Sequence, residues 1–156
     1  MQFNFERQKI MPEFEVKVKI NKPLETVYSE FMNFENMNKW LTGFRGIETL
    51  HGAEGKVGSK YRITFEEDGK EIFFIEEVTG IKENEEFSFR MHHDSFSSEN
   101  KIRFRRLATQ TEVLSRVQAK GNNLLWKLLL PLMKNEMQKR QEKDFIKLKN
   151  FVESKN

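Results

Sequence analysis

The stretch from Gly43 to Gly121 carries only strand patterns, interrupted at short intervals by turn residues. Its six runs lie near residues 44–51, 59–67, 70–79, 86–94, 101–107 and 111–119. Asp68-Gly69 separates two of these runs, and an Asp-Gly pair between alternating apolar residues is a strong hairpin signal. Because all the connections are short, consecutive runs are expected to pair antiparallel, as a meander.

A seventh strand and two short helices are predicted before this stretch. Residues 13–20 alternate strictly between apolar and charged side chains, which is typical of a half-buried strand. Pro23 then suits the first turn of a helix. The apolar face of that helix consists of Leu24, Val27, Tyr28 and Phe31. A second short helical turn is expected over residues 34–41, with Trp40 near its end.

A long helix is predicted after Gly121, capped by Asn122 or Asn123 and running almost to the C-terminus. Pro131 has no N–H group, so we expect a short turn, a break or kink there, and a long helix beyond it. A seven-stranded sheet must cover its apolar face, and only this helix is long enough. The predicted fold class is α+β: a curved antiparallel sheet around a long C-terminal helix, with an internal apolar cavity between them.

The 156 residues suit one domain, which we place at residues 12–154 after an N-terminal extension over residues 1–11. The absence of cysteine excludes a disulfide scaffold, a thiolate nucleophile and any Cys-ligated zinc. The first residues lack an apolar stretch of signal-peptide length. The longest apolar run, near residues 124–133, is too short to span a bilayer. We therefore expect a cytoplasmic protein without stable membrane insertion.

Several kinds of site are disfavoured by the sequence. A net charge of +3 is too small to indicate a nucleic-acid partner. The segment from Gly52 to Ser59 lacks the spacing of a phosphate-binding loop. His92 and His93 are neighbours on a strand and point to opposite faces, so they do not indicate a metal site. No cofactor and no metal are predicted.

Side-chain alternation along the strands and the apolar faces of the helices give a set of residues expected to line the cavity. The apolar members are Phe31, Trp40, Phe65, Phe74, Phe89, Phe104, Val113, Val117, Met133 and Met137. Four polar groups are predicted to orient a ligand: Tyr61, His93, Ser115 and Asp144. Plainer alternatives stay open, since Asp144 could pair with Arg140 one turn earlier and His93 could be a buried, satisfied histidine. The all-apolar run 124–130 is expected to be buried under loops, or else to border the cavity entrance or contact a membrane or partner.

The order and spacing of these elements resemble a known superfamily. The segments that carry the resemblance are Ile20–Tyr28, Trp40, Val57–Tyr61, Glu76–Val78, Thr111–Val113, Gly121 and Asp144–Glu153. Over about residues 11–154 the chain resembles the START and birch-pollen-allergen-like superfamily (SRPBCC), and within it the small bacterial polyketide cyclase/dehydrase and lipid-transport proteins. The resemblance implies a helix-grip fold with a hydrophobic cavity between sheet and C-terminal helix. It transfers no catalytic residue, because the family's enzymes share no short catalytic motif.

Three functions are compatible with this sequence. Binding or transport of a bulky hydrophobic small molecule, such as a lipid, an isoprenoid or a polyketide-like compound, is favoured. A cyclase or dehydratase would instead need an acid or base in the same cavity, for which His93 and Asp144 are the candidates. A protein-partner module, like the chaperone activators of the superfamily, would have a small or filled cavity. Monomer and homodimer both stay open.

Overall fold

The fold is taken from a computed structural model, which describes residues 11–156. The proposed N-terminal extension therefore lies outside the described residues, apart from Met11. The strands are β1 (Glu13–Ile20), β2 (Phe44–His51), β3 (Lys60–Glu67), β4 (Lys70–Lys82), β5 (Glu86–His92), β6 (Phe96–Leu107) and β7 (Gln110–Gly121). The helices are α2 (Leu24–Met32), the 3-10 turn η1 (Phe34–Asn36), α3 (Met37–Trp40) and α4 (Leu124–Glu153).

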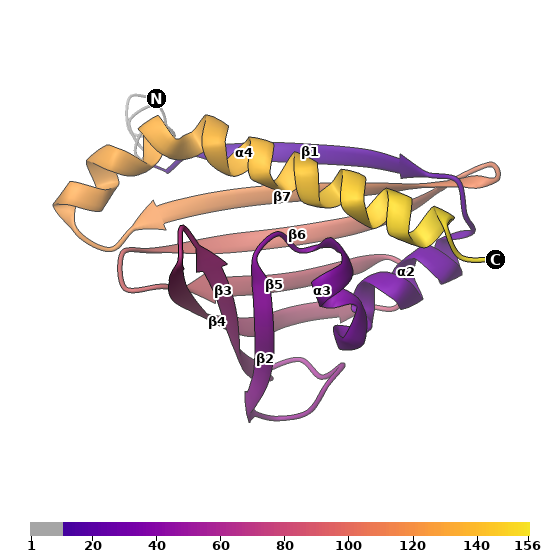
Figure 1. The fold of residues 1–156 in the computed structure, drawn as a ribbon, viewed down its shortest axis with the longest axis horizontal. Coiled ribbons are helices and arrows are strands. Elements are labelled where there is room, and N and C mark those ends of the chain that lie inside the picture. Colours follow the sequence, from indigo (N-terminus) through magenta and orange to yellow (C-terminus); the bar gives the residue numbers. More distant parts are fainter. Residues whose placement is uncertain (1–10) are drawn as a thin grey trace.

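The seven strands form one antiparallel sheet in the order β1-β7-β6-β5-β4-β3-β2. The six-strand meander and the helix-grip architecture are thus confirmed, and β1 joins the meander beside its last strand. Figure 1 shows α4 running along β1 and β7, while β2 and β3 cross the direction of β6 and β7 at the other end of the sheet. This strong twist curls the sheet and separates its two ends into different environments.

Two strands extend further than the sequence pattern predicts. β6 begins at Phe96 rather than near residue 101, because its polar start is paired on both sides, with β5 and with β7. Ser98 and Asn100 are buried there, and Asn100 Nδ2 donates to Ser98 Oγ at 2.9 Å. β4 continues past Gly80 to Lys82, with a register shift between Val78 and Gly80 that leaves Thr79 as the extra residue of a bulge.

Helix α4 is continuous through Pro131, so the predicted break is wrong. Asn123 caps the helix, accepting a hydrogen bond from the Trp126 N–H at 3.0 Å. The ribbon of α4 bends within its first third (Figure 1), in agreement with the predicted kink. Leu130, directly before the proline, is fully buried, and this packing helps to offset the hydrogen bond that proline cannot make.

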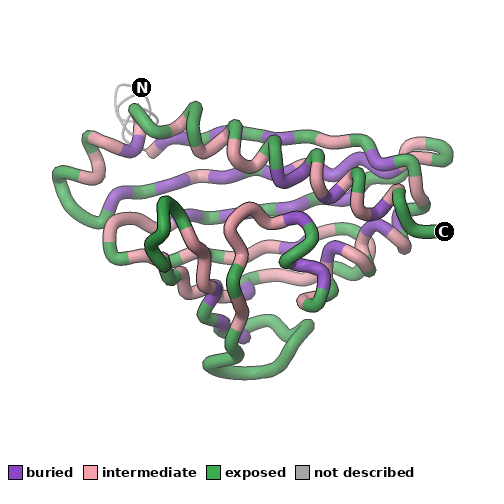
Figure 2. The backbone as a smooth tube through the Cα atoms, in the orientation of Figure 1, coloured by how far each residue is buried: buried purple, intermediate pink, exposed green. Residues whose placement is uncertain are grey.

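The main core lies where α4 covers β1 and β7. Its fully buried members include Ile20, Val27, Val113, Leu148 and Val152, and Figure 2 shows buried positions following the strands beneath α4. The start of α4 differs, because its outer face exposes four leucines by 62–79%: Leu124, Leu125, Leu128 and Leu132. The expectation that the run 124–130 is buried is therefore wrong for Leu124, Leu125 and Leu128. No helix within residues 11–156 has the length and apolarity needed to cross a membrane.

Candidate functional site

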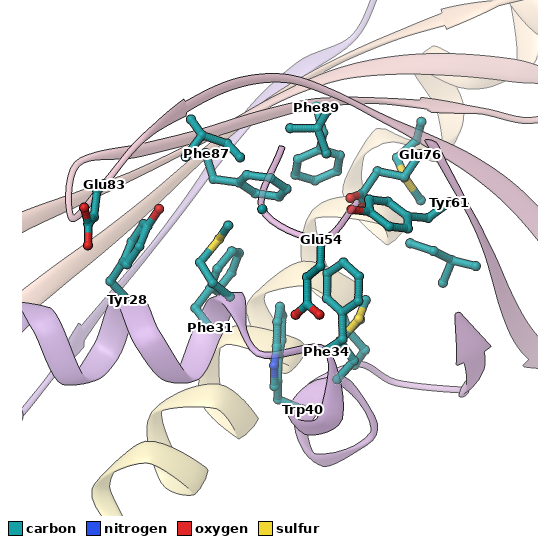
Figure 3. Close-up of a pocket in the computed structure, with 18 of the residues that line it drawn as sticks. Tyr28, Phe31, Phe34, Trp40, Glu54, Tyr61, Glu76, Glu83, Phe87 and Phe89 are labelled. Atoms are coloured by element: carbon teal, nitrogen blue, oxygen red, sulfur yellow. The ribbon is translucent and has the colours of Figure 1, made fainter. Parts of the chain in front are cut away.

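A pocket of about 500 Å³ lies between the inner face of β3, β4 and β5 and the short helices α2, η1 and α3 (Figure 3). Nineteen residues line it: Tyr28, Phe31, Met32, Phe34, Met37, Trp40, Leu41, Glu54, Gly55, Tyr61, Ile63, Phe65, Glu76, Val78, Ile81, Glu83, Phe87, Phe89 and Met91. None of them belongs to α4, so the predicted position between the sheet and the C-terminal helix is wrong for this pocket. The reason is that α4 packs directly onto β1 and β7, at the other end of the sheet.

The strands supply the pocket floor by alternation. Every second residue of β3 and of β5 faces inward, and the same period on β4 brings in Glu76 and Val78. The bulge after Val78 changes the parity of β4, so that Ile81 and Glu83 also face the pocket. The wall opposite is aromatic, with the rings of Phe31 and Trp40 5.2 Å apart.

Five of the fourteen predicted site residues line this pocket: Phe31, Trp40, Tyr61, Phe65 and Phe89. Their contact with a ligand remains a prediction. The other nine lie elsewhere: Phe74, His93, Phe104, Val113, Ser115, Val117, Met133, Met137 and Asp144. Their placement followed from a cavity against α4, and the pocket is not there.

His93 lies in the hairpin between β5 and β6. Its ring packs against Phe74 and Phe96, with centroids 5.2 and 5.7 Å away, and Phe96 in turn contacts Trp126 of α4. The His93 Nδ1 atom accepts a hydrogen bond from the Ser95 N–H at 3.1 Å. This arrangement agrees with the alternative prediction, in which His93 is hydrogen-bonded to a neighbour and packs against other side chains of the protein.

Asp144 holds the connection between α3 and β2 onto α4. Its Oδ1 atom accepts two hydrogen bonds from Thr42, from the backbone N–H at 2.9 Å and from Oγ1 at 2.5 Å. Arg140 does not pair with Asp144, but donates to the Thr42 carbonyl at 3.0 Å. Asp144 and Arg140 thus both hydrogen-bond to Thr42 and fix this loop residue against α4.

The remaining six residues outside the pocket are mostly core. Val113, Ser115 and Val117 are buried on β7 beneath α4, and Phe104 packs edge-on against Tyr28 and Phe31 behind the pocket wall. Phe74 belongs to the His93 cluster, and Met137 packs against the core. Met133 is 38% exposed on α4.

Tyr61 lines the pocket, but its hydroxyl is hydrogen-bonded to the backbone of the protein. Tyr61 Oη donates to the Ala53 carbonyl at 3.0 Å, and Ser59 Oγ donates to the same oxygen at 2.6 Å. These bonds hold the loop between β2 and β3 at the pocket, where Glu54 is exposed. Burial raises the pKa of Tyr61, and the charges of Glu76 and Glu54 add to this effect.

Fourteen of the nineteen lining residues were not predicted, and Glu76 is the buried titratable one among them. It is only 7% exposed and lies on the inner face of β4, and the structure shows no hydrogen-bond partner for its carboxyl within residues 11–156. Burial raises its pKa from 4.5 to about 7. Alternation with Phe74 and Val78 could have identified it, because all three side chains share one face of the strand.

Two further carboxylates border the pocket, Glu54 beside Phe34 and Glu83 at one end beside Tyr28 (Figure 3). Burial raises the pKa of Tyr28, and the charge of Glu83 raises it further. Within residues 11–156 no three His, Asp or Glu side chains converge as a metal site requires. The acidic groups are therefore distributed around an apolar space.

The comparisons with solved structures agree on the fold. Ara h 8.0201 shares 15% identity with this chain, with a TM-score of 0.77 over 93% of this chain and 99% of its own. A START superfamily protein from Mycobacterium smegmatis shares 19%, with a TM-score of 0.73 over 91% and 97% of the two chains. The di-domain ARO/CYC StfQ from the steffimycin biosynthetic pathway shares 9%, with a TM-score of 0.78 over 97% of this chain and 53% of its own.

At these identities the similarity establishes the fold alone. No curated protein matches the sequence. A protein family does match, over residues 11–153, and it spans β1 to α4 with the whole pocket inside. On this match, the chain belongs to the family described as polyketide cyclase / dehydrase and lipid transport.

Proposed function

We propose that this protein binds or transports a bulky hydrophobic small molecule, a lipid, an isoprenoid or a polyketide-like compound, in the pocket between β3–β5 and the short helices. The observation that carries the proposal is the pocket itself. Its volume of about 500 Å³ falls within the roughly 300–1,000 Å³ of small-molecule sites, and its walls are mainly aromatic and aliphatic. Each Å² of apolar ligand surface removed from water contributes about 25 cal/mol before ordering costs.

The proposal is tested first on the purified protein. Native mass spectrometry followed by organic extraction is expected to reveal a co-purifying apolar compound. The same samples are then stripped and titrated with Nile red, a neutral apolar dye. We expect saturable binding to one site, and the absence of both a co-purifying compound and dye binding would contradict the proposal.

A matched pair of variants locates the binding site. Met91→Trp fills the pocket from β5 and is expected to weaken Nile red binding about tenfold, because the dye loses the space it occupies. Met133→Trp makes the same change on α4, outside the pocket, and should leave binding unchanged. Equal affinities in the two variants would place the dye elsewhere.

A second candidate function is an enzyme of the cyclase or dehydratase kind. Neither His93 nor Asp144 lines the pocket, so Glu76 replaces them as the candidate acid or base. A buried carboxyl with a pKa raised to about 7 is suited to donate or accept a proton near neutral pH. Turnover of a polyketone substrate would be expected to fall at least about 100-fold in Glu76→Gln. Undiminished turnover in that variant would remove this candidate.

The partner-module alternative predicts a small or filled cavity, and the pocket found here counts against it. The proposal keeps a cytoplasmic location, a monomer or homodimer, and no nucleic-acid partner. The last point is supported by the modest net charge of +3.

A further inference from the structure

The charged side chains of the pocket all have the same sign. Among its nineteen lining residues, Glu54, Glu76 and Glu83 carry carboxylates, and none carries a positive charge. The chain as a whole has 27 Lys and Arg against 24 Asp and Glu, so its composition does not explain this acidic lining. The pocket is therefore an acidic site in a basic protein.

Glu76 lacks a partner within the described part of the chain. The residue is only 7% exposed, and its carboxyl opens into the pocket next to Tyr61 (Figure 3). The Tyr61 hydroxyl already donates to the Ala53 carbonyl, and the structure shows no other donor for Glu76. A buried carboxylate without a partner is costly, whereas one paired with a cation is stabilised. A ligand that brings the missing donor would gain affinity from this group.

We propose that the ligand of this pocket is a hydrophobic amine, whose protonated nitrogen pairs with the Glu76 carboxylate while its apolar body packs between β5 and the short helices. This inference rests on the proposed binding function and specifies its ligand class. Phe87 and Phe89, stacked with their ring centroids 5.1 Å apart, provide the apolar surface beside Glu76.

The other two carboxylates strengthen the preference for a cation. Glu54 is exposed on the loop at the pocket, so it attracts a cation as it enters. Glu83 adds negative charge at the opposite end, beside Tyr28. An anionic ligand such as a fatty acid would place its carboxylate near the carboxylates of Glu54 and Glu83 and near Glu76, which is partly ionised at neutral pH, and this is unfavourable. Pairing with an ammonium group also lowers the pKa of Glu76 toward its ordinary value, so that the bound carboxyl is ionised at neutral pH.

The experiment compares three probes with the same twelve-carbon chain. Dodecylamine, dodecanol and dodecanoate are used, below their micellar concentrations, to displace Nile red at pH 7.5. We expect dodecylamine to bind about tenfold more tightly than dodecanol, and dodecanoate to bind most weakly. If dodecanol or dodecanoate binds as well as the amine, the inference is overturned while the binding function stands. If none of the three displaces the dye, the inference is also overturned, whereas the proposed function fails only if Nile red itself does not bind.

Glu76→Gln tests the assignment to one residue. It is expected to abolish the preference for dodecylamine, so that the ratio of the dodecylamine and dodecanol affinities falls from about ten to about one. Glu77→Gln is the matched control, because Glu77 is the next residue on β4, faces the other side of the sheet and does not line the pocket. It should preserve the preference. A preference that survives Glu76→Gln overturns the inference.

A second variant keeps the test decisive if Glu76→Gln fails to fold, which thermal unfolding would show. Glu54→Gln changes an exposed loop residue that makes no structural hydrogen bond within residues 11–156. It is expected to reduce the amine preference two- to threefold, on the order of one exposed charge. No reduction in Glu54→Gln, with Glu76→Gln unfolded, counts against an acidic recognition site.

Discussion

Glu76 makes the stability of this protein depend on pH in an unusual direction. Its pKa is about 7 in the folded protein and 4.5 in the unfolded chain, so between these values the folded state holds a proton that the unfolded state has lost. The free energy of unfolding contributed by this group therefore falls as pH rises from 4.5 to 7, and is constant outside that window. At 1.36 kcal/mol per pKa unit, the loss amounts to about 3 kcal/mol.

Glu76→Gln removes this dependence. We expect the free energy of unfolding of the native protein, relative to Glu76→Gln, to fall by about 3 kcal/mol between pH 4.5 and 7.5, because other titrating groups cancel in the difference. Urea unfolding at several pH values measures it, with Glu77→Gln as the control that retains the slope. A difference that is flat across the window, or that rises with pH, would show that Glu76 is not buried as described.

Asp144 illustrates a polar residue whose role is structural. Its carboxylate accepts the two hydrogen bonds that the Thr42 N–H and hydroxyl donate. A hydrogen bond to a charged group contributes about 1.5–3 kcal/mol to the free energy of unfolding. Asp144→Asn should lower the free energy of unfolding by about 1–3 kcal/mol with little change in Nile red affinity. Glu142→Gln, an exposed change on the same helix, provides the comparison. A large loss of dye affinity at an unchanged free energy of unfolding would indicate that Asp144 contacts the ligand.

At the scale of elements, α4 places neighbouring leucines in opposite environments. Leu130 is fully buried, while Leu128 is 65% exposed. Leu130→Ala is therefore expected to cost about 2–5 kcal/mol, and Leu128→Ala no more than about 0.5 kcal/mol. Urea unfolding of both variants measures the contrast. Similar costs would mean that the start of α4 is covered in solution, as the all-apolar run 124–130 first indicated.

The strands and helices could be predicted from local patterns, with failures where pairing outweighed composition. Alternation over residues 13–20 identifies β1, and Asp68-Gly69 identifies the turn between β3 and β4. The polar start of β6 reads as a loop, yet Ser98 and Asn100 satisfy each other inside the sheet. This segment is held as a strand by its pairing with β5 and β7, which local composition does not encode.

At the scale of the molecule, the two ends of the sheet differ in what covers their inner face. Beneath α4 the inner face of β1 and β7 forms the main core, with Val113 and Leu148 fully buried. At the other end, β3–β5 and the short helices leave the pocket. Alternation correctly turned Phe65 and Phe89 inward, but it could not say which helix would face them. That depends on the twist of the whole sheet, and for this reason Met133 and Met137 were placed in a cavity they do not line.

This division predicts which backbone amides a bound ligand protects from hydrogen exchange. Amide hydrogen exchange of the stripped protein, followed with and without saturating Nile red, should slow in β3–β5, α2 and α3, because a ligand that binds only the folded pocket suppresses its local opening. Exchange in β1, β7 and the buried half of α4 should stay unchanged, since those amides already open only with global unfolding. In Met91→Trp the added indole should slow the same amides without dye. Protection confined to β1, β7 and α4 would instead place the ligand against the C-terminal helix, where the sequence first located the cavity.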